Sequence, residues 1–350
     1  MTRHDPVTSA PTRLRARLAT HAAGTVTKKA PGQDGRGYRR WRGPLAVLAA
    51  FVALGVWGAG PGSISAVSVM SLALMYVALA QGWNLLGGYA GYVNFGMVTF
   101  FGIGAYTTAI SATDWNLYPL VTVPLAGIVA GLAAVLIGIP TLRLRGGYFA
   151  IATFVLSLAV QALALVLPLT RESTGIIVPG LGISIDSATR VFFLLFLALS
   201  VVATGLCLLV ERTRWHSALV AIREDEDAAE VLGVPTTALK SAALVIGSVI
   251  AGVAGSFYAT QLFFIEPTGT FDFNISLGVV VAAVIGGSGT WFGPVIGAII
   301  TEVLAQELFI YVQGVYNQLV YGGLLVIVVL LAPRGLMSLG RRWPGRRFST

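Results

Sequence analysis

The sequence predicts an all-α polytopic membrane protein with about ten transmembrane helices and one short, charged helix between two of them. Apolar residues make up 56% of the 350 residues and charged residues only 11%, which leaves too little polar surface for a water-soluble domain. Apolar runs of bilayer length recur along the chain, and lysine and arginine gather in alternate connections between them. Composition, spacing and charge placement therefore indicate the same class.

Each predicted span is an apolar run of roughly the length that a helix needs to cross the membrane. About 20 residues are required, because a helix rises about 1.5 Å per residue and the hydrocarbon layer is roughly 30 Å thick. In chain order the predicted spans are Pro44–Gly60, Ser63–Leu86, Val93–Ala112, Tyr118–Pro140, Tyr148–Pro168, Val191–Val210, Ala238–Phe264, Phe273–Gly286, Phe292–Val312 and Gln318–Ala332. The connections are too short to form an independent core, so residues 44–336 are expected to be one membrane domain.

The basic residues predict the direction of the spans, because cytoplasmic connections carry the excess of lysine and arginine. With the N-terminus inside, all but two of the 23 basic residues lie on the cytoplasmic side. Arg171 and Arg190 are the exceptions, and both fall in the longest external loop. An even number of spans then places both termini in the cytoplasm and exposes the charged segment 214–233 there.

The two ends of the chain are expected to be basic cytoplasmic tails. Residues 1–43 lack apolar periodicity, so we expect them to be disordered and to contact anionic membrane lipid. An organelle transit peptide is an alternative interpretation of this Arg-rich start. Residues 337–350 form the second tail. The net charge of +8 thus reflects orientation in the membrane, and we expect no nucleic-acid partner.

Motifs of catalysis are missing from the sequence. There is no GxxxxGK[ST] phosphate loop, no HExxH, no CxxC and no GxSxG. The three histidines lie in the tail and in one loop, and the single cysteine, Cys207, lies in an apolar span. We therefore expect no enzymatic activity, no metal site and no cofactor bound to this chain.

Glycine, with 42 residues, has two expected roles. The GxxxG pairs Gly127–Gly131 and Gly293–Gly297 predict close helix packing, because small residues let helix backbones approach in lipid. The short links GGYAGY at 87–92 and GGSGTW at 286–291 separate neighbouring spans. They are either plain turns or re-entrant elements, which transporters use to expose backbone to a substrate.

The segment 214–233 predicts an amphipathic helix. Its apolar positions, which recur at helical intervals, are Leu219, Ile222, Ala229 and Leu232. Gly233, with Pro235 just beyond it, is a typical helix stop. Its acidic residues are Glu224, Asp225, Glu226, Asp227 and Glu230. A helix lying on the bilayer is the simplest interpretation, but the anionic inner leaflet repels such a cluster, which favours docking of a protein partner.

Four ordered blocks, covering about Gln81 to Leu336, resemble the permeases of branched-chain amino acid ABC importers, specifically the LivM-like half. Ala221–Gly233 resembles their coupling loop, and Asp227-Ala228-Ala229 with Gly233 matches the spacing of the EAA motif, with aspartate in place of glutamate. Gly88–Tyr106, Gly286–Gly297 and Ala332–Leu336 are similar to three further blocks of the family.

The resemblance implies a permease subunit in the bacterial plasma membrane that forms half of the pathway for branched-chain or related amino acids. It implies a second permease subunit, two ABC ATPases that bind the ATP, and an extracytoplasmic solute-binding protein. The residues that it assigns to ATPase coupling are Arg223, Glu224, Asp225, Glu226, Asp227, Ala228, Ala229, Glu230 and Gly233. The candidates for the translocation path in its glycine-rich blocks are Gly88, Gly91, Asn94, Gly96, Met97, Gly287 and Gly289, and Met97 stands where the family often has histidine.

A carboxylate inside the bilayer is a further candidate, because it must face a cavity or a partner. Glu302 lies within a predicted span, and Gln306 is one helical turn away on the same face. Glu302 could bind a substrate ammonium group or be protonated and packed. The alternative function is an ion-coupled secondary transporter of a small polar solute, in which Glu302 or Glu307 carries the coupling ion.

Overall fold

The computed structural model describes residues 36–311. The predicted span Gln318–Ala332, the block Ala332–Leu336 and the tail 337–350 lie outside the described residues. So does most of the tail 1–43, although residues 36–43 form the start of a helix. The chain divides into two compact units, residues 1–50 and 51–350. In the first unit, the described residues 36–50 are helical and include Pro44.

The described part of the chain is mostly helical, with twelve α-helices. They are α2 (Arg36–Ala59), α3 (Ile64–Trp83), α4 (Met97–Asp114), α5 (Val123–Thr141), α6 (Gly147–Val166), α7 (Ile185–Glu211), α8 (Arg214–Glu224), α9 (Glu226–Val231), α10 (Thr236–Leu262), α11 (Pro267–Thr270), α12 (Phe273–Gly286) and α13 (Gly293–Tyr311). A π-helical turn, η2 (Asn84–Gly88), extends α3, and three short 3₁₀ turns are η3 (Pro119–Val121), η4 (Pro168–Thr170) and η5 (Glu172–Thr174). Two short strands are β1 (Ile176–Ile177) and β2 (Phe264–Ile265).

The expected number of spans is supported in part. Within the described residues, five helices are long and apolar enough to cross a membrane: Ile64–Gly88, Gly147–Val166, Ile185–Glu211, Thr236–Leu262 and Pro267–Gly286. Shorter apolar helices occupy Gly43–Ala59, Val123–Gly138 and Gly293–Gln306. Every predicted span up to residue 311 therefore falls on a helix, but the count of about ten transmembrane helices is not confirmed.

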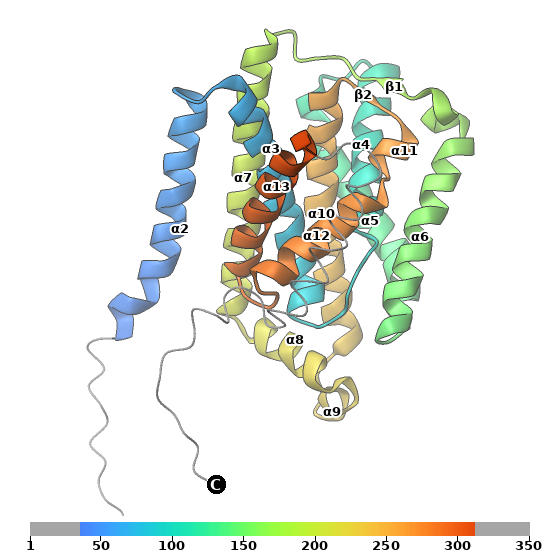
Figure 1. Cartoon of the computed structure of the whole chain (residues 1–350). Helices are drawn as coiled ribbons and strands as arrows, with labels where there is room; N and C mark the ends of the chain where they lie inside the picture. Colours follow the sequence, from blue (N-terminus) through green and yellow to red (C-terminus); the bar gives the residue numbers. More distant parts are fainter. Residues whose placement is uncertain (1–35, 312–350) are drawn as a thin grey trace, which may run out of the picture. The chain divides into compact units, whose positions relative to one another are not determined.

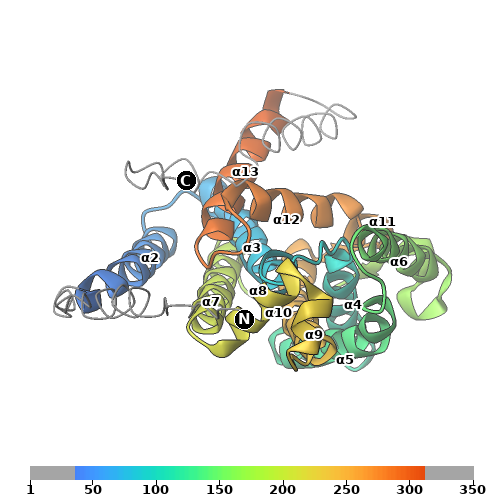
Figure 2. The same ribbon diagram turned by 90° about the horizontal axis from the view of Figure 1, so that it is seen from below.

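Helix α10 lies at the centre of the larger unit, between α3, α4 and α5 (Figures 1 and 2). Glycines allow this: a Cβ on Gly82 of α3 would lie only 3.1 Å from the backbone oxygen of Gly247 on α10. The GxxxG pair of α5 also faces α10, because a Cβ on Gly131 would lie 2.9 Å from the Val249 side chain. Close approach of backbones gives dispersion contacts that lipid cannot replace. The packing role of Gly127–Gly131 is therefore confirmed.

Helix α3 also packs against α7, α12 and α13. Ser200 of α7 donates a hydrogen bond of 2.7 Å to the carbonyl oxygen of Leu74 on α3. Helices α12 and α13 form a tight hairpin in which Gly293 and Gly297 of α13 contact the backbone of α12. This second GxxxG pair also packs helices, as predicted.

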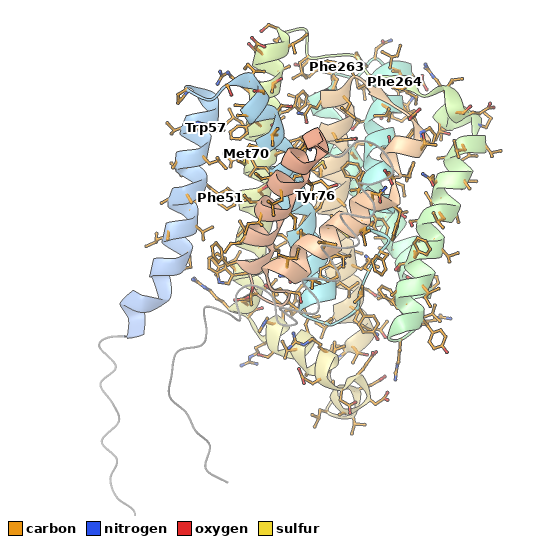
Figure 3. The ribbon with its side chains drawn as sticks, viewed as in Figure 1. Phe51, Trp57, Met70, Tyr76, Phe263 and Phe264 are labelled. Carbon is orange, nitrogen blue, oxygen red and sulfur yellow. The ribbon has the colours of Figure 1, made fainter. Side chains whose placement is uncertain are left out.

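The bundle has two ends, which we name by the elements at each. At the β1–β2 end, Ile176 pairs with Ile265 in an antiparallel ladder, next to Phe263 and Phe264 (Figure 3). At the α8–α9 end, the chain leaves α7 after Glu211, forms α8 and α9, and enters α10 at Thr236. Helices α7 and α10 run between these two ends.

Candidate functional site

The charged segment 214–233 forms two helices, so the prediction of one amphipathic helix is wrong. Helix α8 ends at Glu224, and Asp225 adopts an extended conformation with φ −159° and ψ 109°. The Asp225 carboxylate accepts a hydrogen bond of 3.0 Å from the backbone N–H of Ala228 and so caps α9. Aspartate commonly interrupts a helix in this way, because its side chain satisfies the first free amides of the next one.

The break changes which apolar residues are buried. Leu219, Ile222 and Ala229 are buried, as predicted. Leu232, predicted on the same face, is 82% exposed, and its neighbour Val231 is 88% exposed. The end of α9 therefore presents an apolar pair to its surroundings, which periodicity over a continuous helix did not predict.

The predicted stop at Gly233 is confirmed. Gly233 has a positive φ of 85°, which a residue with a side chain rarely adopts. Its N–H bonds the carbonyl oxygen of Glu230, and the N–H of Val234 bonds that of Ala229. These bonds satisfy carbonyl groups at the end of α9 and turn the chain toward α10.

Glu226, at the start of α9, points into the bundle. Its carboxylate lies 2.5 Å from the ammonium group of Lys240 on α10, and Tyr92 donates a hydrogen bond to it. Lys240 is only 2% exposed and also donates to the Tyr92 hydroxyl at 3.1 Å. The Arg145 guanidinium approaches Glu226 at 3.9 Å from the α5–α6 connection. Four segments of the chain thus meet at one carboxylate.

The pKa of Glu226 reflects these contacts. Partial burial alone would raise the pKa, because it disfavours the charged form. The hydrogen bonds from Lys240 and Tyr92, and the positive charges of Lys240 and Arg145, outweigh burial and lower the pKa below its ordinary value. The carboxylate is therefore ionised at neutral pH.

The other acidic residues of the segment point outward. Asp227 and Glu230 have side chains that are 78% and 63% exposed, although both lie within 4.0 Å of Arg145. Glu224 pairs with Arg223 at 3.3 Å and is also exposed. The predicted acidic cluster is thus divided, with Glu226 bonded to the bundle and the remaining side chains facing away from it.

Arg223 connects α8 to both glycine-rich links. Its guanidinium donates to the carbonyl oxygen of Gly88 at 3.3 Å, and its methylene stem packs against Gly91. A Cβ on Gly289 would lie 3.0 Å from the same guanidinium and 3.0 Å from the Gly88 carbonyl oxygen. Gly91 and Gly289 both have positive φ, as does Gly287. The structure therefore brings the two links together beside α8, which their separation of roughly two hundred residues in the sequence did not predict.

Polar side chains of α3, η2 and α7 hold the second link in place. Asn84 accepts a hydrogen bond of 2.8 Å from the N–H of Gly289 and donates one of 3.0 Å to the carbonyl oxygen of Thr290. Gln81 donates to the carbonyl oxygen of Trp291 at 2.7 Å, and Glu211 accepts from the Trp291 N–H at 2.5 Å. A polar residue within an apolar run, such as Asn84, predicts hydrogen bonding between segments of the bundle. The particular partners in the link 286–291 were not predicted.

The other translocation-path candidates are packed in two separate places. Asn94 accepts from the N–H of Gly96 at the start of α4, and Met97 is buried against Gly82. Glu302 is 6% exposed and accepts a hydrogen bond of 3.1 Å from Gln306, so the predicted shared face is confirmed.

Neither Met97 nor Glu302 is among the residues that line the cavity at the β1–β2 end. The side chain of Glu307 lies outside the described residues.

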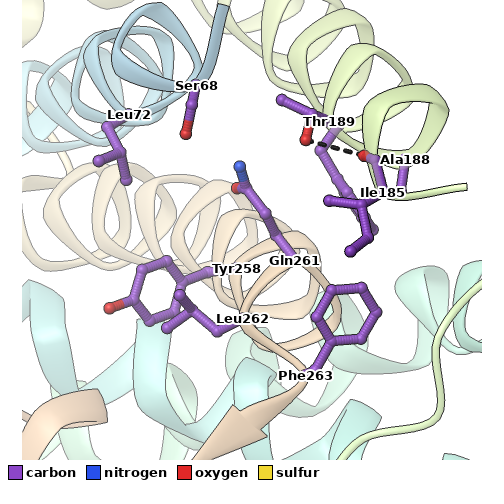
Figure 4. Close-up of a pocket in the computed structure, with 10 residues that line it drawn as sticks. Ser68, Leu72, Ile185, Ala188, Thr189, Tyr258, Gln261, Leu262 and Phe263 are labelled. Atoms are coloured by element: carbon purple, nitrogen blue, oxygen red, sulfur yellow. Dashed lines mark hydrogen bonds between the residues drawn. The ribbon is translucent and has the colours of Figure 1, made fainter. Parts of the chain in front are cut away.

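This cavity, of about 180 Å³, was not predicted. It lies between α3, α7 and α10 and is lined by apolar groups and by the neutral polar side chains of Ser68, Thr189, Tyr258 and Gln261. The Gln261 amide points toward Ser68 (Figure 4), and its buried oxygen lacks a hydrogen-bond partner among the described residues. Within the same residues, no cluster of histidine, cysteine or acidic side chains could hold a metal ion.

Comparison with known proteins identifies the family. Residues 65–329 match the model of the branched-chain amino acid transport system permease component family. The chain is 32% identical over 306 residues to the LivM permease protein of Salmonella typhimurium, covering 80% of this chain and 71% of that protein. It is 26% identical over 294 residues to the BraD permease protein of Pseudomonas aeruginosa, covering 78% and 94%.

A shorter match of 134 residues, at 30% identity, links it to the LivH permease protein of Salmonella typhimurium and covers 38% of this chain and 43% of that protein. No solved structure matches the chain. The relatives are named as permease proteins of high-affinity branched-chain amino acid transport systems. The apolar helices agree with a multi-pass membrane protein, and the chain belongs to the family of branched-chain amino acid transport system permease components.

Proposed function

We propose that this chain is a non-enzymatic permease subunit of an ATP-driven importer, and that it forms half of the pathway for branched-chain or related amino acids. The transported class follows from the names of the relatives. The observation that supports an energy source outside this chain is the form of the α8–α9 unit. Its tip is exposed, and its inner side is bonded to the bundle. Such a unit can receive force from another protein and pass it to the helices.

The chain requires partners for this role. Its likeness to both LivM and LivH supports pairing with a second permease subunit. Because the sequence has no phosphate loop, ATP is bound and hydrolysed by two separate ATPase subunits. An extracytoplasmic solute-binding protein delivers the amino acid at the β1–β2 end.

The α8–α9 end faces the cytoplasm of a bacterial cell in this proposal. The basic side chains at that end are Arg143, Arg145, Arg212, Arg214, Arg223 and Lys240, whereas Arg171 and Arg190 are at the β1–β2 end. This distribution follows the positive-inside rule. Both termini are then cytoplasmic, with residues 44–336 as the permease domain between the basic tails 1–43 and 337–350.

The docking tip consists of the exposed acidic and large apolar residues of α9 and of the residue after it, which are Asp227, Glu230, Val231 and Leu232. An apolar pair flanked by carboxylates fits a groove with an apolar floor and basic edges. Closure of the ATPases on this tip shifts the equilibrium between two packings of the bundle. The positive-φ glycines beside Arg223 supply the bending points.

A pull-down tests the docking tip. The double substitution Val231→Asp and Leu232→Asp alters two side chains that are already exposed, so the fold is expected to persist. We expect co-purification of the ATPases to fall by about tenfold or more, because the substitution removes the apolar anchor of the interface. The matched control is Ile177→Asp with Ile183→Asp at the β1–β2 end, where both side chains are also exposed. Retention of the ATPases by the tip variant refutes the docking role.

The rival function is ion-coupled secondary transport, which the buried Glu302 carboxyl group favours. The purified chain in proteoliposomes, without ATPases, distinguishes the two. Under our proposal it takes up no leucine when a proton or sodium gradient is applied. Gradient-driven uptake that is lost in Glu302→Gln establishes the rival instead.

A further inference from the structure

Lys240 is a buried ammonium group that the proposed docking of α9 does not use. It lies in the first turns of α10 and is 2% exposed, with its charge directed at Glu226. Among the six ion pairs of the described residues, this pair has both side chains largely enclosed. A buried pair gains little net stability, because desolvation of two charges offsets their attraction, so stability alone does not account for this pair.

We propose that the Glu226–Lys240 pair is the joint through which movement of α9 is transmitted to α10. Glu226 is then a positioning residue inside the subunit and makes no contact with the ATPase. This inference rests on the proposed function, because it presumes that an ATPase moves α9. It divides the acidic segment into a docking tip and an internal joint with different tasks.

The contacts around the pair support a joint that resists displacement. Lys240 is held by a charge at 2.5 Å, a hydroxyl at 3.1 Å and the face of the Tyr92 ring, whose centroid is 4.5 Å away. The Tyr92 hydroxyl in turn donates to Glu226. Each of the three groups bonds the other two, so α9 and α10 cannot separate at this point without breaking several bonds at once.

Because Lys240 lies on α10, a movement of α9 is passed to the helices that pack against α10. The backbone of α10 lies directly against α3 at Gly247 and against α5 at Gly252, because neither glycine has a side chain. Packed backbones of this kind are stiff, so a tilt of α10 moves its neighbours with it. In contrast, Asp227 meets Arg145 at the surface, where solvent screens the pair and both side chains can reorient.

The test uses the complete importer, with its partner subunits, in proteoliposomes with radiolabelled leucine as the probe. Lys240→Met combined with Glu226→Gln removes both charges and leaves no unpaired buried ion, so the variant is expected to fold. Tyr92→Phe removes one hydroxyl and is the mild variant. Asp114→Asn breaks the exposed pair with Arg171 at the β1–β2 end and is the control. Three quantities are measured: ATPases bound per permease, the rate of ATP hydrolysis, and leucine taken up per ATP.

We expect the double variant to bind the ATPases and to hydrolyse ATP as the unsubstituted importer does, because the docking tip is unchanged. Leucine taken up per ATP falls by about tenfold, a size typical of residues that couple two sites. Tyr92→Phe gives a smaller fall, and Asp114→Asn leaves the ratio unchanged.

Two results overturn the inference. One is leucine uptake per ATP within about twofold of the unsubstituted importer in the double variant, since coupling residues change it by more than this. The other is loss of ATPase binding in the double variant, because Glu226 would then belong to the docking surface. Failure of the unsubstituted importer to use ATP for uptake instead refutes the proposed function, so the two failures are distinguishable.

Discussion

The two ends of the helical bundle are held together by different kinds of contact. At the α8–α9 end, Lys240 and Glu226 form an enclosed ion pair that joins two helices. At the β1–β2 end, the ion pair between Arg171 and Asp114 is half exposed. Arg190 there donates to backbone carbonyl groups, including Gly58 at 2.6 Å, and pairs with no carboxylate among the described residues.

This difference indicates where the molecule can carry force. Exposed ion pairs on long side chains yield easily, because water replaces the lost contact. Enclosed polar contacts do not, because a separated group has no alternative partner. The α8–α9 end concentrates such contacts between the segment 214–233, the glycine-rich links and α10, whereas the ion pair at the β1–β2 end is half exposed.

Loss of one partner of each ion pair gives the largest expected contrast. Lys240→Met leaves the Glu226 carboxylate enclosed without its main counter-charge, and we expect it to lower the free energy of unfolding by about 3–5 kcal/mol. Arg171→Gln is expected to cost less than about 1 kcal/mol, because both side chains are half exposed. Thermal unfolding in detergent measures both. Equal costs would show that the two ends do not differ.

Two glycines with positive φ, one at each end of the bundle, differ in the space around them. Gly289, with φ 79°, is crowded by Arg223 and by the Gly88 carbonyl oxygen, whereas Gly182, with φ 72°, has open space where a Cβ would lie. Valine at either position strains the backbone by about 1–2 kcal/mol. At Gly289 the added overlap costs about 1–3 kcal/mol more. Unfolding midpoints in detergent that fall equally for Gly289→Val and Gly182→Val would contradict this account.

Acid is expected to produce the smallest effect. The pKa of Glu226 in the folded chain lies below its ordinary value of 4.5, because the hydrogen bonds and positive charges contributed by Lys240, Tyr92 and Arg145 outweigh the effect of burial. The stabilisation is therefore complete above a pH of about 4.5 and is lost as the pH falls through the lower folded value. Unfolding midpoints measured from pH 7 to pH 3 should fall less steeply at the acid end in Glu226→Gln. Identical pH profiles for the variant and the unsubstituted chain would exclude this linkage.

The sequence predicted the segment 214–233 only in part. It located the charged segment, its apolar residues Leu219 and Ile222, and its stop at Gly233, because these depend on neighbours within a few turns of helix. It failed at Asp225, whose side chain caps α9 through the N–H of Ala228 and so competes with a continuing helix. The exposure of Leu232 follows from that break.

The number of membrane spans was also predicted only in part from the sequence. Apolar composition located helices at all the predicted spans within the described residues, yet α12, at 14 residues, reaches the length of a crossing only when α11 is included. Length and apolarity determine whether a helix can cross a bilayer. Whether it does so depends on its tilt and its neighbours, which periodicity does not contain.

Taken by itself, the sequence determined the membrane class, the helical ranges and the side of the bundle on which the basic residues gather, because each depends on composition or on local spacing. Only the tertiary structure decided that Tyr92 and Lys240 meet Glu226, and that the link around Gly88 lies against the one around Gly289. These partners come from distant parts of the chain, and the packing of α3, α10 and α12 brings them together. Glu226 and Asp227 are neighbours of the same chemical type. The Glu226 side chain points into the bundle, whereas the Asp227 side chain lies at the surface.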